Sequence, residues 1–262
     1  MFHYTKAVLR VGPRLIGACF GTFQRWAKHL EKYPFPIRHA KFRFLSKKTA
    51  DALQVDLHFF GLENIPHNET FFIVSNHMSA FDPLPILIAV EEPTSFVGKM
   101  ELNSVPLLRT AIKALDVESI DRTDLRQSLK VMMKVESELK NKERNWMIFP
   151  EGTRIRDQML PVAPFHHGTF RPACKAGVTI LPVATWGTYR VLKLHPQFKR
   201  YPVYVSFLKP IHKEEYESLN TSDLADMTRK MIQKEITYHL RPLDHKDMSE
   251  RKEKAYRFNK II

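Results

Sequence analysis

Short β-rich runs alternate with segments of helical periodicity along most of the chain, and no other feature of the sequence restricts its fold as strongly. The clearest run, TFFIVS at 70–75, lies between Asn68 and Asn76 and is typical of a buried strand. The same criteria predict strands at 55–60, 95–97, 146–149, 179–184 and 203–208. Helices are predicted from Pro83 onward, at 105–115, from near Thr123, at 169–176 and at 222–240. This order predicts an α/β layered domain with a mixed, largely parallel central sheet flanked by helices.

The chain divides into three parts on these patterns. Residues 55–240 are expected to form one domain, preceded by an amphipathic helical arm at 1–54 and followed by a charged tail at 241–262. The tail is weakly periodic and is expected to be partly disordered. In the helix that begins near Thr123, five residues at helical spacing are expected to form the apolar face: Leu125, Leu129, Met132, Val135 and Leu139.

The net charge of +13 is concentrated at the two ends of the chain. Residues 1–50 carry eleven Lys or Arg and a single acid, and residues 241–262 carry seven bases and four acids, so the body between them is balanced. A balanced body argues against nucleic acid as a partner. A basic, aromatic arm points instead to an anionic membrane surface, where each nearby Lys or Arg contributes about 1 kcal/mol.

The longest apolar stretch of the arm is too short to cross a membrane. Its best apolar stretch, 15–23, has nine residues, whereas a spanning helix needs about 20. Apolar residues recur there at helical spacing: Leu15, Ile16, Cys19, Phe20, Phe23 and Trp26. A second basic and aromatic segment follows Pro36. These helices either dock on the domain or insert into the membrane interface, and we favour insertion. The protein is accordingly expected on the cytoplasmic face of a membrane, as a peripheral or monotopic protein.

His77 and Asp82 form the strongest candidate for chemistry. His77 follows the predicted buried strand, and ligands of α/β sheets bind in the crevice beyond the strand ends. The Asp-Pro junction at 82–83 predicts a turn that folds Asp82 back toward the imidazole. A carboxylate that fixes the tautomer of a histidine makes the ring a better general base. The alternative is that Asp82 only caps the helix that begins at Pro83 and that His77 is an ordinary loop residue, although both roles of Asp82 are compatible.

The sequence offers no competing protein nucleophile or metal site. It contains no G-x-S-x-G motif, and Ser79 is more simply explained as a backbone partner in a turn. Cys19 and Cys174 are far apart in sequence, and no Cys/His pair has metal-ligand spacing. We therefore expect the substrate's own hydroxyl to be the nucleophile, with neither a metal nor an organic cofactor.

Four short blocks in a fixed order resemble the glycerolipid acyltransferases, and among them the 1-acyl-sn-glycerol-3-phosphate acyltransferases. The first is Asn76-His77 followed by Asp82. The second comprises KMEL at 99–102, Pro106 and SIDR at 119–122. The third, FPEGTR at 149–154, is followed by Phe165, and the fourth is ILPV at 180–183. The resemblance covers about 57–208. The chain departs from the family pattern at Asp116, where glycine is usual, at His166-His167, where a lysine pair is common, and at Thr179, where proline is frequent.

The resemblance implies a reaction and a set of site residues. His77 and Asp82 would be catalytic, and Lys99, Arg122, Glu151, Gly152, Thr153 and Arg154 would bind substrate. A phosphate group suits arginine, whose guanidinium binds it through paired hydrogen bonds. Glu151 could instead order the turn, and Gly152 is expected to permit a tight one. The implied reaction transfers an acyl group from a thioester of acyl carrier protein or coenzyme A to lysophosphatidate.

Two alternatives remain at this point. Within the same class, the acceptor could be glycerol 3-phosphate or another lysophospholipid, because the four blocks do not separate these substrates. In a different class, the chain would be a non-catalytic basic protein that binds membranes. That reading accounts for the charged arm but leaves His77, Asp82 and the FPEGTR segment without a role.

Overall fold

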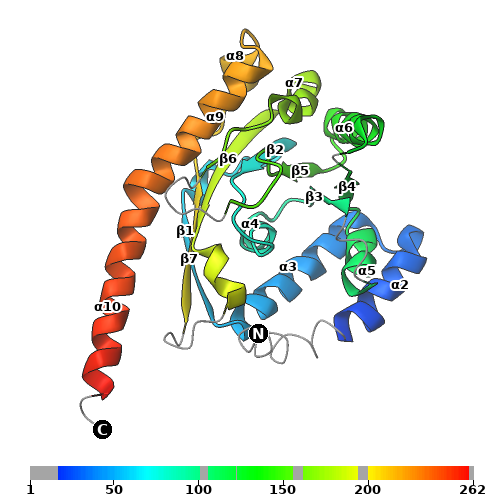
Figure 1. Cartoon of the computed structure of the whole chain (residues 1–262). Coiled ribbons are helices and arrows are strands. Elements are labelled where there is room, and N and C mark those ends of the chain that lie inside the picture. Colours follow the sequence, from blue (N-terminus) through cyan, green and yellow to red (C-terminus); the bar gives the residue numbers. More distant parts are fainter. Residues whose placement is uncertain (1–16, 101–105, 122, 156–161, 194–199, 260–262) are drawn as a thin grey trace.

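The computed structural model describes residues 17–100, 106–121, 123–155, 162–193 and 200–259. Within these ranges, seven strands form one sheet in the order β1-β7-β6-β2-β5-β3-β4 (Figure 1). Strands β2 to β6 are mutually parallel, whereas β7 is antiparallel to β6 and parallel to β1. Their bounds are β1 Val55–Phe60, β2 Phe71–Ser75, β3 Thr94–Lys99, β4 Glu118–Ile120, β5 Asn145–Ile148, β6 Thr179–Trp186 and β7 Tyr201–Phe207. The predicted α/β fold with a mixed, largely parallel sheet is confirmed.

Helices cover both faces of the sheet (Figure 1). Successive residues of a strand point to opposite faces, so Phe72 belongs to one apolar core and Ile73 to the other. The core of Phe72 includes residues of α6, α7 and α9, and that of Ile73 includes residues of α3 and α4. The bounds of these helices are α3 Phe35–Ala52, α4 Pro83–Ala89, α6 Leu125–Lys140, α7 Arg171–Ala176 and α9 Thr221–Glu235.

Helix α6 does not bury the whole apolar face that its sequence predicts. Val135 and Leu139 are buried and Met132 packs against the core, as expected. Leu125 and Leu129 are exposed, with 72% and 45% of their surfaces accessible, so this part of the prediction is wrong. The buried residue of the second turn is Val131, because its direction from the helix axis matches that of Val135 and Leu139.

The described part of the arm packs on the domain rather than leaving its apolar side chains free. Phe23 and Trp26, from the π-helix η1 (Ala18–Phe23) and from α2 (Gln24–Lys28), are buried in a small core with Ala114 of α5 (Pro106–Ala114). The expectation of membrane insertion is therefore wrong for these two side chains, because α5 supplies them with an apolar partner. Residues 1–16 lie outside the described ranges, as do the side chains of Cys19 and Phe20. No helix of the described part is long and apolar enough to cross a membrane.

Asp116 explains one departure from the family pattern. Its φ of 50° is in the left-handed region, where glycine is favoured and aspartate is among the tolerated residues. Its carboxylate accepts hydrogen bonds from the buried Arg38 of α3, at 2.9 and 3.0 Å, and from Arg144, at 2.7 Å. Burial raises the pKa of the Asp116 carboxyl, but the bonds and charges of the two arginines outweigh it and leave this pKa below its ordinary value. The aspartate thus keeps the required turn and ties α3 to the domain.

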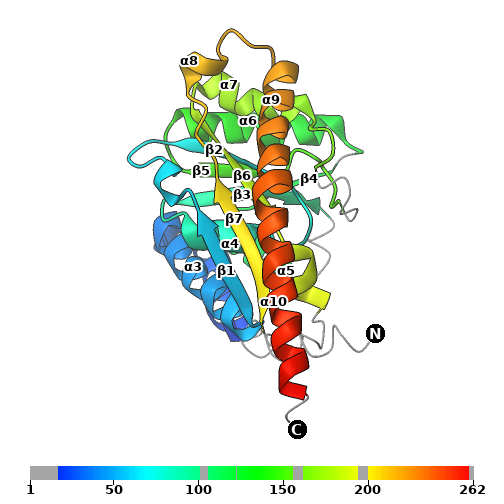
Figure 2. The same ribbon diagram turned by 90° about the vertical axis from the view of Figure 1, so that its left-hand side faces the viewer.

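The charged tail is helical rather than disordered over 241–259. After α9, a π-helix (η7, Ile236–Leu240) leads directly into α10 (Arg241–Asn259), and Figure 2 shows the three as one long rod beside β7. Asp244 accepts hydrogen bonds from Trp186 Nε1 at 2.9 Å and from Arg190 at 2.7 Å. Asp247 accepts one from the Tyr204 hydroxyl at 2.9 Å. These anchors lie far away in the sequence, so local periodicity does not predict them.

Candidate active site

The predicted site residues follow parallel strands at one edge of the sheet. The carboxyl ends of β2, β3, β4 and β5 share this edge because the four strands run in the same direction. β2 ends at Ser75, just before His77, and β5 ends at Ile148, just before the FPEGTR segment. Lys99 is the last residue of β3. The edge is where α/β sheets place their ligands, and it is called the catalytic edge below.

His77 and Asp82 are in direct contact, as predicted. The Nδ1 atom of His77 lies 2.7 Å from Oδ2 of Asp82, and Asp82 is completely buried. The same oxygen accepts the backbone N–H groups of Met78 and Ser79, at 2.7 and 2.8 Å. With the Nδ1 proton directed at the carboxylate, Nε2 keeps its lone pair for a substrate.

The second predicted role of Asp82, as the cap of α4, is wrong. Asp82 occupies the N-cap position, but its side chain makes no capping hydrogen bond and its backbone is already helical, with φ −53° and ψ −39°. The carboxylate turns back toward the 77–79 loop instead. Pro83 at the first helical position has no N–H to satisfy, which reduces the need for a cap.

Asn76 is part of the first sequence block, but the sequence patterns assigned it no role. It is fully buried, and its side-chain amide pairs with the backbone of Thr185 in β6: Nδ2 donates to the carbonyl at 3.0 Å and Oδ1 accepts the N–H at 2.8 Å. This pairing continues the contact between β2 and β6 beyond the last residue of β2. Asn76 thereby fixes the backbone from which His77 projects. The available signal was a polar residue directly after a buried strand.

The FPEGTR segment holds His77 from the other side. The rings of Phe149 and His77 stack with centroids 4.4 Å apart, and the N–H of Ile155 donates to the carbonyl of His77 at 2.8 Å. Oε1 of Glu151 accepts the N–H of His77 at 2.9 Å, and its Oε2 accepts the N–H of Ala163 at 3.4 Å. Glu151 is buried and faces protein backbone, which differs from the substrate contact that the resemblance implies.

The environment of Glu151 favours its protonated form. Burial is the main cause that raises the pKa of its carboxyl to about 8, and the nearby Asp82 charge adds to the effect. The two backbone N–H groups act in the opposite direction, because they stabilise the carboxylate. A group of this kind at a strand-end crevice is a common mark of a functional site.

Of the remaining predicted site residues, four lie within the described ranges and one does not. Gly152 has a φ of 67°, so the tight turn expected there is present. Thr153 and Arg154 are exposed beyond that turn, and Lys99 is exposed at the end of β3. Arg122 lies outside the described residues, two positions after the end of β4. The structure therefore brings His77, Asp82 and Glu151 together, and the substrate-binding roles of Lys99, Arg122 and Arg154 stay predictions.

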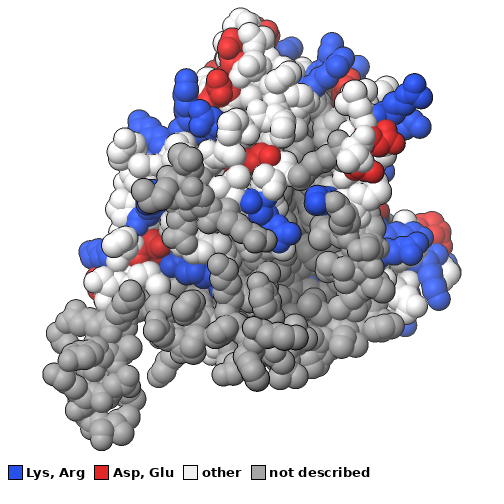
Figure 3. Space-filling model, in the orientation of Figure 1, with Lys and Arg blue, Asp and Glu red and all other residues white. Residues whose placement is uncertain are grey.

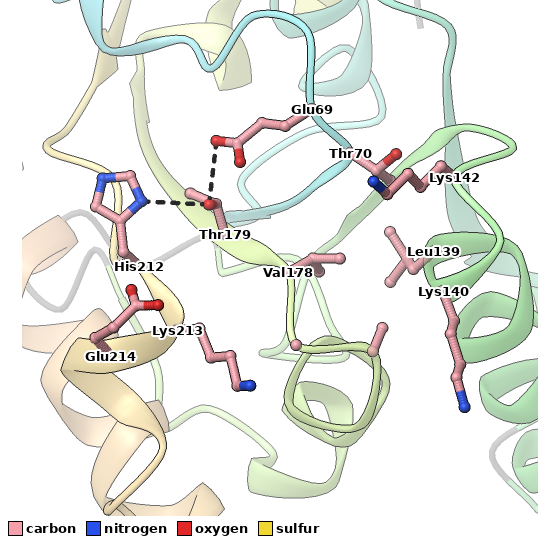
Figure 4. Close-up of a pocket in the computed structure, with 12 residues that line it drawn as sticks. Glu69, Thr70, Leu139, Lys140, Lys142, Val178, Thr179, His212, Lys213 and Glu214 are labelled. Carbon is pink, nitrogen blue, oxygen red and sulfur yellow. Dashed lines mark hydrogen bonds between the residues drawn. The ribbon is translucent and has the colours of Figure 1, made fainter.

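A cavity of about 320 Å³ lies at the opposite edge of the sheet (Figure 4). Thr70 and Thr179, at the amino ends of β2 and β6, form part of its wall, and Thr179 contacts both Glu69 and His212. Its charged lining has both signs: Lys140, Lys142 and Lys213 with Glu69 and Glu214. The cavity is thus separate from the catalytic edge. Among the residues that the structure describes, no three His, Cys, Asp or Glu side chains are grouped to hold a metal ion.

Comparisons with known proteins found a matching family model and several similar enzymes. The family model described as "Acyltransferase" matches residues 56–186. A chloroplast 1-acyl-sn-glycerol-3-phosphate acyltransferase of Arabidopsis thaliana is 31% identical over 155 residues, which cover 58% of this chain and 42% of that protein. The Brassica napus chloroplast enzyme of the same name is 27% identical over 206 residues (72% and 58%), and the Escherichia coli enzyme is 29% identical over 163 residues (62% and 65%). The chain thus spans less than two thirds of the length of these relatives.

A solved structure resembles the chain over nearly its whole length. The crystal structure of the 1-acyl-sn-glycerophosphate acyltransferase from Thermotoga maritima superposes with a TM-score of 0.64 and 24% identity. The match covers 90% of this chain and 94% of that one. At this identity the likeness establishes a shared fold.

Proposed function

This chain belongs to the acyltransferase family, and we propose that it esterifies the sn-2 hydroxyl of 1-acyl-sn-glycerol 3-phosphate with a fatty acyl group to give phosphatidic acid. The observation that carries the proposal is the 2.7 Å contact between His77 Nδ1 and the buried Asp82 at the carboxyl end of β2. The names of the matched relatives support the choice of acceptor and product. The donor is an acyl thioester of acyl carrier protein or coenzyme A.

The proposed reaction proceeds without a covalent enzyme intermediate. His77 Nε2 takes the proton of the acceptor hydroxyl while the hydroxyl oxygen attacks the thioester carbonyl carbon. Asp82 stabilises the imidazolium that forms. The tetrahedral intermediate then collapses, the C–S bond breaks, and the departing thiolate takes the proton from Nε2. The ester and a free thiol are the products, and His77 returns to its starting state.

The phosphate of the acceptor is proposed to bind at Arg154, together with Lys99 and Arg122. A phosphomonoester carries a charge of about −1.5 to −2 at neutral pH, so an exposed arginine two residues after the Gly152 turn suits it. Replacing Arg154 by alanine should raise the KM for lysophosphatidate about tenfold or more and change kcat little. The KM for an acceptor without phosphate, such as monoacylglycerol, should stay the same.

This test is best made on purified protein with a panel of acceptors that includes glycerol 3-phosphate and other lysophospholipids. The control for the loss of one arginine is Arg229→Ala. Arg229 belongs to α9 and is none of the residues proposed to bind substrate. Turnover of glycerol 3-phosphate in preference to lysophosphatidate would replace the proposed acceptor. Absence of turnover with every acceptor, together with intact membrane binding, would favour the non-catalytic alternative.

Glu151 is proposed to position His77 rather than to bind substrate, because both of its oxygens face backbone N–H groups. Its pKa of about 8 lies above the ordinary value of 4.5, so the folded state holds the proton more tightly than the unfolded state. This group therefore stabilises the fold fully below about pH 4.5, and the contribution is lost as the pH rises toward 8. Wild-type stability, relative to Glu151→Gln, should fall over this window in denaturant titrations.

The Glu151→Gln variant also distinguishes a role in positioning His77 from a direct contact with substrate. Glutamine keeps one oxygen to accept the N–H of His77, so Glu151→Gln should retain more activity than Glu151→Ala. Loss of the positioning contact should appear in kcat. An increase in KM for lysophosphatidate at constant kcat would instead support a direct substrate contact.

The exposed face of α3 is proposed as a membrane contact on the cytoplasmic side. Ile37 and Phe44 are 58% and 51% exposed, and the ammonium groups of Lys41 and Lys48 lie 5.1 and 5.5 Å from the Phe44 ring centroid. Apolar side chains surrounded by lysine suit the interface of an anionic bilayer. The double variant Ile37→Ser/Phe44→Ser should bind anionic vesicles more weakly in a sedimentation assay. Tyr238→Ser, which alters an exposed aromatic residue elsewhere, should bind as well as the wild type.

A further inference from the structure

Helix α6 carries two parallel rows of side chains on its outer side. The apolar residues of one row, Leu125, Leu129 and Met133, are 72%, 45% and 68% exposed. A base directly follows each of them in the sequence: Arg126, Lys130 and Lys134. A four-residue repeat keeps each row on one side of a helix, and eight residues extend over about 12 Å. This surface is called the α6 face below.

The fold uses only one member of these rows. The residues that attach α6 to the core, Val131, Val135 and Leu139, lie on the other side of the helix. Lys134 is bound to Glu118 at 2.6 Å and is a structural contact. Arg126 and Lys130 form no ion pair with any residue in the described ranges. Three exposed apolar side chains and two bases are therefore not used by the part of the fold that the structure describes.

The acidic residues Asp121 and Asp124 near the start of α6 are held by local hydrogen bonds and form no ion pair with Arg126 or Lys130 within the described ranges. Asp121 accepts hydrogen bonds from the backbone and hydroxyl of Thr123, at 2.9 and 2.6 Å. Asp124 caps the helix by accepting the N–H of Gln127 at 3.0 Å. Figure 3 shows both basic and acidic side chains over the part of the surface that α6 occupies in Figure 1.

The α6 face begins at the catalytic edge. β4 ends there at Ile120, α6 starts at Leu125 and returns toward the opposite edge, where β5 begins. β4 is three places from β2 in the sheet, and three strand spacings amount to about 14 Å. A protein bound to the α6 face would therefore sit beside the site that contains His77.

We propose that the α6 face docks an acidic acyl carrier protein, which presents its acyl thioester to His77. This inference rests on the proposed function and chooses between the two donor classes. Interfaces between proteins combine apolar contacts with charged residues, and the α6 face offers both; complementary charge accelerates association. A bilayer is a poorer occupant, because α3, the proposed membrane contact, packs on the opposite face of the sheet from α6.

The test is a charge reversal measured with two donors that carry the same acyl chain. Arg126→Glu/Lys130→Glu should raise the KM for the acyl carrier protein thioester about tenfold or more, and this effect should shrink at high salt. Turnover with acyl-coenzyme A should be unchanged. The matched control is Lys230→Glu/Lys234→Glu on α9, which reverses two exposed lysines at the same spacing and should affect neither donor. A glutamate in the first turn of α6 suits the helix dipole, so the variant is expected to fold.

Each other result overturns the docking assignment in a recognisable way. Equal losses with both donors would indicate damage to the common site, and no loss with either would leave the α6 face without this partner. A wild-type protein that uses acyl-coenzyme A alone would also contradict docking but would leave the proposed function intact. Failure of the wild type with every donor and acceptor would instead contradict the proposed function itself.

Discussion

Replacing His77 by alanine should lower kcat for acyl transfer by about 10³–10⁴-fold and leave the KM for lysophosphatidate nearly unchanged. The proposed nucleophile is a substrate hydroxyl, which is a weak nucleophile until its proton is removed. Nε2 of His77 is the only ring nitrogen available for that proton, because Nδ1 is 2.7 Å from the Asp82 carboxylate. The residues proposed to bind the phosphate follow other strands in the sequence and are not altered. The measurement is steady-state turnover of purified protein with both acyl donors.

Two controls keep this result interpretable. His166→Ala removes an exposed histidine that lies near the FPEGTR segment in sequence, and it should leave turnover unchanged. Thermal unfolding of His77→Ala should show whether loss of the ring stacked on Phe149, at 4.4 Å, disturbs the fold. A folded variant with near-normal turnover would contradict the assignment of His77 as general base.

Local sequence patterns predicted those parts of the structure that depend on neighbouring residues. The alternation of strands and helices predicted the layered fold, and the positions of His77 and Asp82 around an Asp-Pro junction predicted their contact. The strands and helices were predicted from the spacing of apolar residues along each segment. The contact between His77 and Asp82 was predicted because the two residues are only five positions apart. The helix start at Pro83 was predicted for the same reason, although Asp82 does not cap it.

Contacts between distant segments could not be read in this way. Asn76 pairs with Thr185 and Glu151 with the N–H of His77, and nothing in the intervening sequence encodes either contact. The exposure of Leu125 and Leu129 depends on which side of α6 meets the sheet, which apolar periodicity alone does not specify. The sequence of α10 is polar and weakly periodic, and it therefore predicts a partly disordered tail. The helix is anchored through Asp244, which accepts hydrogen bonds from Trp186 and Arg190 in a distant part of the chain.

Replacing Asp82 by asparagine should lower kcat by about 10- to 100-fold while the 77–82 loop keeps its shape. The asparagine Oδ1 can still accept the N–H groups of Met78 and Ser79, which now bond to Oδ2 of Asp82. The same oxygen can accept the Nδ1 proton of His77, which also points at Oδ2 in the wild type, so the imidazole keeps its tautomer. The imidazolium that forms during the reaction, however, loses the negative charge that stabilises it, because an amide is neutral.

The comparison of single and double variants tests whether the two residues act as one unit. If Asp82 works only through His77, then His77→Ala/Asp82→Asn should be no less active than His77→Ala alone, because the losses of coupled groups do not multiply. Asp124→Asn is the matched control, since aspartate and asparagine cap helices about equally well and Asp124 caps α6. Losses that multiply in the double variant would give Asp82 a separate role. A stable Asp82→Asn protein with normal kcat would mean that the buried carboxylate supports the loop and not the chemistry.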